Sequence, residues 1–167
     1  MARTKIFRSL GLLRLSSPSI VDGDPFPNRH TADGDNLSPA LSWSEPRPGS
    51  ASIVLTCEDL RGLHGSPFTL WIVFNVPPAL RELPEGLSKV ALPPEVPGAI
   101  QGINDTGSVG YDGPAPPPRH PAHRYLFKIH SLDSPLDLPP GIKRQVLERA
   151  MEGHILETGT LLGTCRR

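Results

Sequence analysis

The feature that most constrains this chain is a nine-residue apolar run at positions 68–76, FTLWIVFNV. Successive side chains of a strand point to opposite faces, so we expect one face to carry Phe68, Leu70, Ile72 and Phe74, and the other Trp71 and Val73. A strand that is apolar on both faces must be covered on both sides, which places it at the centre of a sheet. In a chain of 167 residues, enough for one core, an antiparallel β-sandwich is the simplest arrangement that buries such a strand.

Further strands are predicted from the same alternation. Residues 41–44 and 52–58 read as strands, and residues 158–165 as a short last strand. In the predicted strand that ends near Leu132, one face carries Tyr125, Phe127 and Ile129, and the other Leu126, Lys128 and His130. The 21 prolines and 16 glycines are spread along the chain, which is typical of short strands joined by long ordered loops. The fold is therefore expected to be mostly β.

One or two short peripheral helices complete the expected fold. Ile6, Leu10 and Leu13 stand at helical spacing, so residues 3–15 predict an amphipathic helix. Near the end, Ile142, Val146, Arg149 and Ala150 mark helical rows, and Gly153 is a natural stop. We expect a single domain over 1–167, with a helical extension at 1–20 and the core at 21–167.

Charge and composition argue against several classes of protein. Lysine plus arginine equals aspartate plus glutamate, 17 each, which argues against binding to nucleic acid and against a polybasic membrane-surface protein. The N-terminal apolar run is too short for a signal sequence, and no run is long enough to insert stably into a membrane. Cys57 and Cys165 lie in apolar strand-like runs, so reduced thiols are expected, with no disulfide framework. The protein is predicted to be cytoplasmic.

Standard catalytic and metal motifs are missing from the sequence. It contains no G-x-S-x-G elbow and no phosphate-binding glycine loop. Residues 33–36, DGDN, are typical of a turn. They lack the flanking helices and the closing glutamate of a calcium-binding loop, so we do not expect calcium there. His120 and His123 are three residues apart but flank a proline, so zinc is a weak prediction. We expect no cofactor, no metal and no catalytic residue.

One cluster does suggest a site. A stiff glycine- and proline-rich loop leads into His123, Arg124 and Tyr125 at the mouth of a strand, and Asp59 ends another strand. These groups could share one hollow and bind an anion through N–H and O–H donors, with Asp59 holding the imidazole. The same set could perform acid/base chemistry. Alternatively, Arg124 pairs with Asp59 or another acid and only supports the sheet.

Several longer motifs resemble one known family. They are DGDNLSPALSW (33–43), FTLWIVFNVP (68–77), GINDTGSVGYDGPAPP (102–117), HRYLFKIHSLD (123–133) and AMEGHILETGTLLGT (150–164). In this order they resemble the phosphatidylethanolamine-binding proteins, in particular their bacterial Raf-kinase-inhibitor-like branch. The resemblance implies a β-sandwich with an anion pocket that takes phosphate, phospholipid head groups or nucleotides. Some members inhibit kinases or proteases, and bacterial members are often dimeric.

The resemblance also assigns site residues. The family's H-R-Y matches His123, Arg124 and Tyr125, its paired prolines match Pro116 and Pro117, and the first aspartate of its D-P-D-x-P motif matches Asp59. Two positions depart from the family pattern. Arg61 replaces the second aspartate, and Leu70 stands where the family has a pocket histidine. Because leucine donates no hydrogen bond, we expect phosphate binding to be weaker by about 1–3 kcal/mol.

Three functions follow as hypotheses. The first is a non-catalytic protein that binds a small anionic or phosphorylated ligand, such as a phospholipid head group, through Asp59, His123 and Tyr125. The second is an inhibitor of a kinase or protease that acts through its proline-rich loops. The third is a small biosynthetic enzyme that reuses the pocket, with His123 and Asp59 as acid and base. A homodimer is a further prediction.

Overall fold

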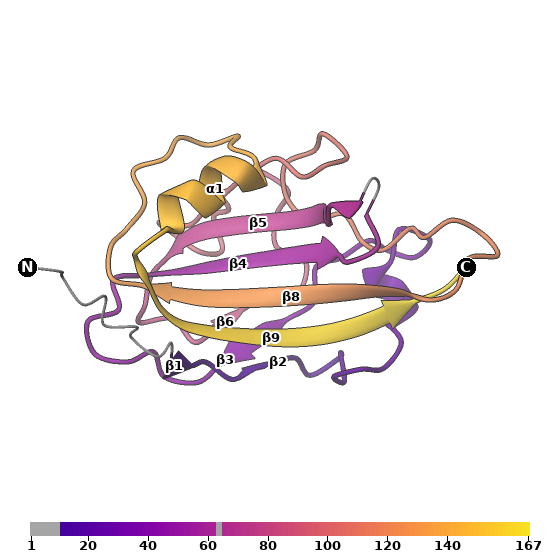
Figure 1. The fold of residues 1–167 in the computed structure, drawn as a ribbon, viewed down its shortest axis with the longest axis horizontal. Coiled ribbons are helices and arrows are strands. Elements are labelled where there is room, and N and C mark those ends of the chain that lie inside the picture. The colour runs from indigo at the N-terminus through magenta and orange to yellow at the C-terminus, as the bar shows by residue number, and fades with distance from the viewer. Residues whose placement is uncertain (1–10, 63–64) are drawn as a thin grey trace, which may run out of the picture.

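The computed structural model describes residues 11–62 and 65–167 and is built mostly of strands (Figure 1). The strands are β1 (Gly11–Leu12), β2 (Leu15–Ser16), β3 (Leu41–Trp43), β4 (Ser52–Asp59), β5 (Phe68–Val76), β6 (Glu82–Leu83), β7 (Ile100–Gln101), β8 (His123–Leu132) and β9 (Ile155–Cys165). One α-helix, α1 (Arg144–Met151), and a short 3-10 helix, η1 (Asn28–His30), complete the described elements. The predicted mostly β fold with short helices is confirmed.

The strands form two sheets. The larger has the order β1-β9-β8-β4-β5-β7, and the smaller has the order β2-β3-β6. Every pair is antiparallel except β1 with β9, which run parallel at the sheet edge. The long strands β4, β5, β8 and β9 lie side by side across the middle of the molecule, with the small sheet behind them and α1 beside β5 (Figure 1).

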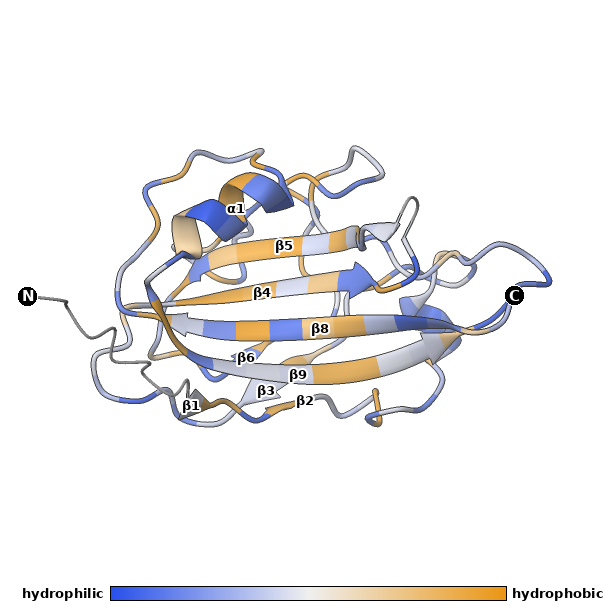
Figure 2. Ribbon diagram, viewed as in Figure 1, coloured by the Kyte–Doolittle hydropathy of each residue, from blue (hydrophilic) through white to orange (hydrophobic). Residues whose placement is uncertain are grey.

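Two apolar clusters lie on opposite faces of the large sheet. The first fills the space between the two sheets and includes Trp43, Leu55, Trp71 and Phe127. The second lies under α1 and includes Val54, Phe74, Leu147 and Met151. Strands β4 and β5 are coloured as hydrophobic over most of their length, whereas β8 alternates between hydrophobic and hydrophilic residues (Figure 2). This contrast matches strands buried on both faces beside one that is buried on a single face.

The alternation predicted for β8 is confirmed. Tyr125, Phe127 and Ile129 belong to the cluster between the sheets. On the other face, the Lys128 amine contacts Glu58 at 3.0 Å, and His130 is part of the cavity under α1. Strand β9 begins earlier than predicted, at Ile155, and pairs with β8 along most of its length.

The faces predicted for β5 are confirmed for Ile72 and Phe74 on one side and Trp71 and Val73 on the other, but the prediction is wrong for Phe68 and Leu70, because a β-bulge interrupts the alternation. Cys57 pairs with Trp71, but the next residue of β4, Glu58, pairs with Thr69, so Leu70 is the extra residue. Leu70 consequently joins Trp71 in the cluster between the sheets, and Ile72 lies in the cluster under α1. A bulge places two successive side chains on one face, which period-two reasoning cannot foresee.

The predicted helical extension at 1–20 is wrong where the structure describes it. Positions 11–12 and 15–16 are strands, while Ile6 and Leu10 of the predicted apolar row lie outside the described residues. Leu13 and Leu15 are buried, and the Leu13 amide donates to the Thr158 carbonyl at 3.0 Å. The leucines therefore follow strand periodicity and cover the core instead of forming a helical row.

The C-terminal helix is confirmed, but its buried row differs from the prediction. Leu147 and Met151 are the buried residues of α1, whereas Val146 is 45% exposed. Residues four apart lie on one helical face, and the face that meets the sheet is the one that carries Leu147. The chain turns at Gly153, which has a φ of +79°.

Candidate functional site

Strand pairing brings the predicted acid and imidazole together. Asp59 at the end of β4 pairs with Tyr125 of β8, and His123 lies two residues earlier on the same face of β8. The His123 Nδ1 atom lies 2.7 Å from the Asp59 Oδ2 atom. His123 is 6% exposed and Asp59 is 8% exposed. Two residues that are 64 positions apart in sequence therefore form one buried pair.

The contacts of Asp59 determine which nitrogen of His123 can meet a ligand. A carboxylate accepts hydrogen bonds, so the Nδ1–H of His123 donates to it and Nε2 is left for other contacts. The second carboxylate oxygen, Oδ1, accepts the backbone N–H of Arg61 at 2.8 Å. With both of its oxygens engaged, Asp59 fixes the orientation of the imidazole ring.

Tyr125 lies next to the pair. Its ring stacks on the His123 ring with a centroid distance of 6.3 Å and an interplanar angle of 25°. Burial raises the pKa of the Tyr125 phenol, and the negative charge of Asp59 raises it further. Both effects disfavour the phenolate, so Tyr125 keeps its proton and can serve as a hydrogen-bond donor.

The pair lies in the wall of a cleft with two adjoining compartments, which we call the Asp59 cleft. The outer compartment measures about 230 Å³ and is lined by Asp59, Arg61, Gly62, Phe68, Ala115, Pro116, Pro117 and His123. The inner compartment measures about 90 Å³ and is lined by Asp59, Phe68, Leu70, Thr106, Asp112, Gly113, Ala115 and Tyr125. Because Asp59, Phe68 and Ala115 line both compartments, all seven predicted site residues surround one hollow.

Leu70 reaches the inner compartment because of the bulge in β5. Without the extra residue, strict alternation would point this side chain toward α1. Leu70 is only 4% exposed and packs in the cluster between the sheets. The inner compartment therefore has an apolar side chain at a position where the family pattern has an imidazole donor.

Asp112 is a cleft residue that our sequence reasoning missed. Its carboxylate accepts hydrogen bonds from Asn104 at 3.0 Å and from Asn36 at 3.3 Å. Burial acts to raise the pKa of Asp112, but hydrogen bonds from Thr106 and the two asparagines, together with the charge of Lys89, outweigh it and lower the pKa. Asp112 is therefore ionised at neutral pH. Asp112 lies in the family motif at 102–117, but we predicted no acidic site residue from that motif.

The alternative role for Arg124 as the partner of Asp59 is wrong. In the described structure the Asp59 carboxylate bonds to His123 and to the Arg61 backbone. The side chain of Arg124 is exposed, and its carbonyl accepts the Leu60 amide at 2.9 Å. The alternation of β8 explains this outcome, because Arg124 points to the face opposite that of His123 and Tyr125.

Residues 11–62 and 65–167 present neither a candidate metal centre nor a membrane-spanning helix. This part of the chain contains no group of three or more His, Cys, Asp or Glu side chains that could hold a metal ion. It also contains no helix long and apolar enough to span a bilayer. Cys57 is buried and Cys165 is partly exposed, and both are free thiols.

Sequence similarity to known proteins identifies the family of this chain. A family model described as phosphatidylethanolamine-binding protein matches residues 16–166. The chain belongs to this family. The UPF0098 protein of Methanothermobacter thermautotrophicus is 40% identical over 156 residues, which cover 93% of this chain and 99% of that protein. The UPF0098 protein YbhB of Escherichia coli is 41% identical over 128 residues, covering 72% of this chain and 78% of YbhB.

Solved structures agree with this assignment. The crystal structure of a phosphatidylethanolamine-binding protein homologue from Chlamydia trachomatis superposes with a TM-score of 0.82 at 32% identity, covering 94% of this chain and 99% of that one. The crystal structure of Escherichia coli YbcL, described as a new member of the mammalian family, gives a TM-score of 0.86 at 25% identity, covering 93% of this chain and 98% of YbcL. The resemblance found in the sequence is thus confirmed at the level of family and fold.

Proposed function

We propose that the Asp59 cleft binds a small ligand with one anionic head group, such as a phosphate or carboxylate, and does not catalyse its conversion. The observation that carries this proposal is the buried His123–Asp59 pair at 2.7 Å in the wall of an open hollow. A purely structural ion pair would need no adjoining space. The volumes of about 230 and 90 Å³ are small compared with sites for drug-sized ligands, so they favour a head group.

Each cleft residue has a role in this proposal. The Nδ1–H of His123 is already given to Asp59, so an anion is bound by a proton on Nε2, which requires the imidazolium form. The Tyr125 phenol supplies a second donor, and Asp59 keeps the ring oriented. Arg61, Pro116 and Pro117 form the rim of the outer compartment.

The inner compartment limits which ligands fit. It combines two carboxylates, Asp59 and Asp112, with the apolar Leu70. Negative charge of a ligand is therefore better placed in the outer compartment, beside His123 and Arg61, and the inner compartment suits an uncharged or positively charged part. We expect the affinity for inorganic phosphate to be modest, because the donor replaced by Leu70 is worth about 1–3 kcal/mol.

A calorimetric titration with phosphate and phosphoethanolamine tests this proposal. We expect both to bind wild type, and His123→Ala to reduce affinity at least about tenfold, since a charge-assisted hydrogen bond is worth about 1.5–3 kcal/mol. His154→Ala is the matched control, because this half-exposed histidine bonds to Asp133, away from the cleft. An unchanged affinity in His123→Ala, or no binding of either anion to wild type, contradicts the proposal.

The second candidate is inhibition of a kinase or protease through protein contact. The observation that favours it is the loop at 117–122, which is exposed along its length and extends beyond the ends of β8 and β9 (Figure 1). This role needs no anion site. Arg119→Ala, an exposed change within this loop, would weaken capture of such an enzyme without changing phosphate affinity, and failure to capture any enzyme with the full chain would remove this candidate.

Three further hypotheses about this protein come from its sequence. The biosynthetic-enzyme alternative uses His123 and Asp59 as acid and base and is tested by product formation from candidate substrates. The homodimer is tested by sedimentation. The cytoplasmic location is a proposal that the two free thiols favour, since disulfides persist mainly in oxidising compartments.

A further inference from the structure

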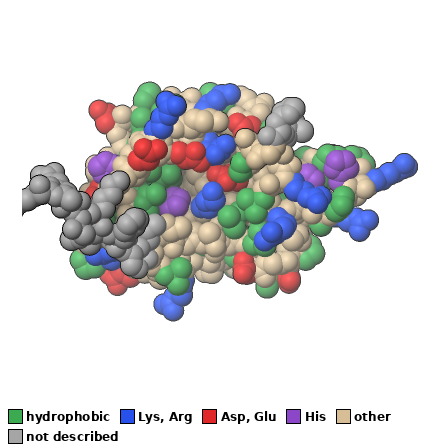
Figure 3. All heavy atoms as spheres, viewed as in Figure 1, with side chains coloured by type: hydrophobic (Ala, Val, Ile, Leu, Met, Phe, Trp, Pro, Cys, Tyr) green, Lys and Arg blue, Asp and Glu red, His purple; other side chains and the backbone are tan. Residues whose placement is uncertain are grey.

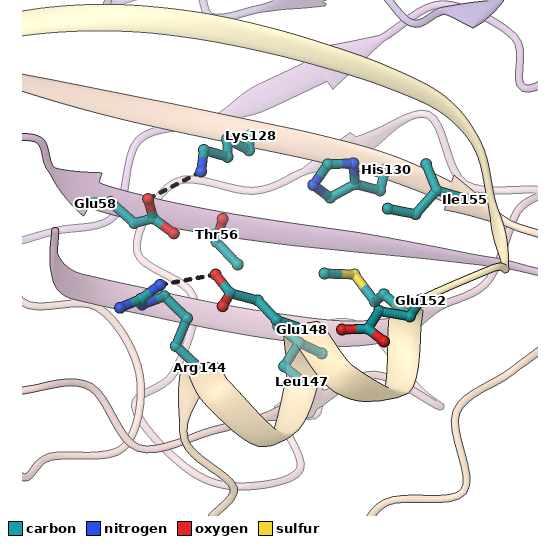
Figure 4. A pocket seen from close by; sticks show the side chains of 10 residues that line it. Thr56, Glu58, Lys128, His130, Arg144, Leu147, Glu148, Glu152 and Ile155 are labelled. Carbon is teal, nitrogen blue, oxygen red and sulfur yellow. Dashed lines mark hydrogen bonds and ion pairs between the residues drawn. The ribbon is translucent and has the colours of Figure 1, made fainter. Parts of the chain in front are cut away.

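A second cavity lies on the other face of the large sheet, between α1 and strands β4 and β8. We call it the α1 cleft. It measures about 280 Å³ and is larger than either compartment of the Asp59 cleft. One wall carries Lys128 and His130 of β8, and Glu148 and Glu152 line the other from α1 and its end, with Thr56 of β4 between them (Figure 4). In the space-filling view, charged side chains gather over this face of the molecule (Figure 3).

The charges in the α1 cleft leave carboxylate oxygens in excess. Lys128 Nζ lies 3.0 Å from Glu58 Oε2, and Arg144 Nη1 lies 2.8 Å from Glu148 Oε1. These contacts engage one oxygen of each glutamate, and Glu152 adds a third carboxylate. With two cations and three anions, the lining carries a net negative charge when His130 is neutral. Glu58 is only 2% exposed, so its charge acts in a poorly solvated site.

Two further side chains add acceptors. Thr56 is 4% exposed, and within the described chain its hydroxyl has no hydrogen-bond partner, although it points into the cavity (Figure 4). His130 Nδ1 lies 3.0 Å from Thr158 Oγ1. Burial lowers the pKa of His130 to about 4, with a smaller effect from the charge of Lys128, so the ring carries no charge at neutral pH.

The α1 cleft also has an apolar part of its lining. It consists of Leu147 and Met151, which are buried on α1, and Ile155 at the start of β9. A ligand that matches both parts of the lining must combine hydrogen-bond donors and positive charge with a short hydrocarbon chain. An anion would be repelled by the three carboxylates. The two cations that could bind it, Lys128 and Arg144, are already paired with glutamates.

We propose that the α1 cleft binds a small alkylammonium ion, a primary amine on a short unbranched carbon chain. The ammonium group donates to the free oxygen of Glu58 and to the Thr56 hydroxyl, and Glu148 and Glu152 add favourable charge. The chain packs against Leu147, Met151 and Ile155. This site is independent of the Asp59 cleft, which lies on the opposite face of the sheet.

The test is an NMR titration of the folded full-length chain with n-pentylamine, at a pH where the amine is protonated. We expect the amides of Thr56, His130 and Met151 to shift, and n-pentanol and pentanoate to bind at least about fivefold more weakly, since one hydrogen bond is worth about 1 kcal/mol. Equal binding of the alcohol would show that charge is not recognised and would overturn the proposal, as would the absence of shifts with the amine.

Variants locate the site. Thr56→Val keeps the shape of the side chain but removes the hydroxyl, and Glu152→Gln removes an exposed charge, so neither should unfold the chain. We expect each variant to weaken pentylammonium binding at least about threefold. Glu82→Gln on β6 of the small sheet is the matched control for loss of one exposed carboxylate. If the control weakens binding as much as Glu152→Gln, the amine is attracted by general charge alone and the proposal fails.

Discussion

Replacing Leu70 by histidine should strengthen phosphate binding, because it restores a donor at the position where the family has one. Leu70 lines the inner compartment with Asp59, Asp112 and Tyr125. An imidazolium there offsets the charge of the two carboxylates that keep anions out of the inner compartment, and from beside Asp59, which lines both compartments, it can donate one charge-assisted hydrogen bond to a phosphate in the outer compartment, worth about 1.5–3 kcal/mol. The dissociation constant for inorganic phosphate should therefore fall about 10- to 100-fold.

The substitution has a cost in stability that must be measured with it. Leu70 is 4% exposed within the cluster between the sheets, and exposing a buried leucine side chain costs about 1.5–3 kcal/mol, part of which the new ring recovers. The assay is calorimetric titration with phosphate below pH 6.5, with the thermal midpoint recorded for each protein. Leu70→Asn is the control for a polar but uncharged side chain. A folded Leu70→His variant with unchanged or weaker phosphate affinity would refute the reasoning.

Three further predictions concern other parts of the fold. His130→Gln should make the free energy of unfolding less sensitive to acid. The pKa of His130 is lowered to about 4 in the folded protein, so below about pH 6.5 the unfolded chain takes up a proton that the folded chain does not. In urea unfolding, wild type should therefore lose about 3 kcal/mol more stability than the variant between pH 7 and pH 4. Gly159→Ala should destabilise the fold by more than about 2 kcal/mol, because the new Cβ would lie 1.9 Å from the Leu13 carbonyl oxygen; an unchanged thermal midpoint would contradict this. Cys165 should react with a thiol reagent in the folded state well before Cys57, whose burial raises its pKa well above the ordinary value; equal labelling rates, resolved by peptide mapping, would count against the buried position of Cys57.

The long strands and the helix were predictable from the sequence because their patterns are long and consistent. Residues 52–58, 68–76 and 123–132 each carry enough apolar side chains for periodicity to identify a strand. The family motifs then identified Asp59 and His123 as site residues. What the sequence could not show is the register, which decides that these two side chains meet.

The failures have local physical causes. The bulge at Leu70 arises where β4 and β5 change register between Cys57 and Glu58. No residue in FTLWIVFNV predicts this change of register. Leu13 and Leu15 were assigned to a helix because leucines at several spacings fit both periods, and pairing of this segment with β9 and β3 decided the outcome. Asp112 was missed because its role depends on hydrogen bonds from distant residues such as Asn36.

The most direct test of the account is a crystal structure grown with inorganic phosphate. The account predicts a phosphate in the outer compartment of the Asp59 cleft, about 3 Å from His123 Nε2, with Nδ1 still bonded to Asp59. A structure in which Asp59 and His123 are apart, or in which side chains fill the compartment and phosphate lies elsewhere, would contradict it.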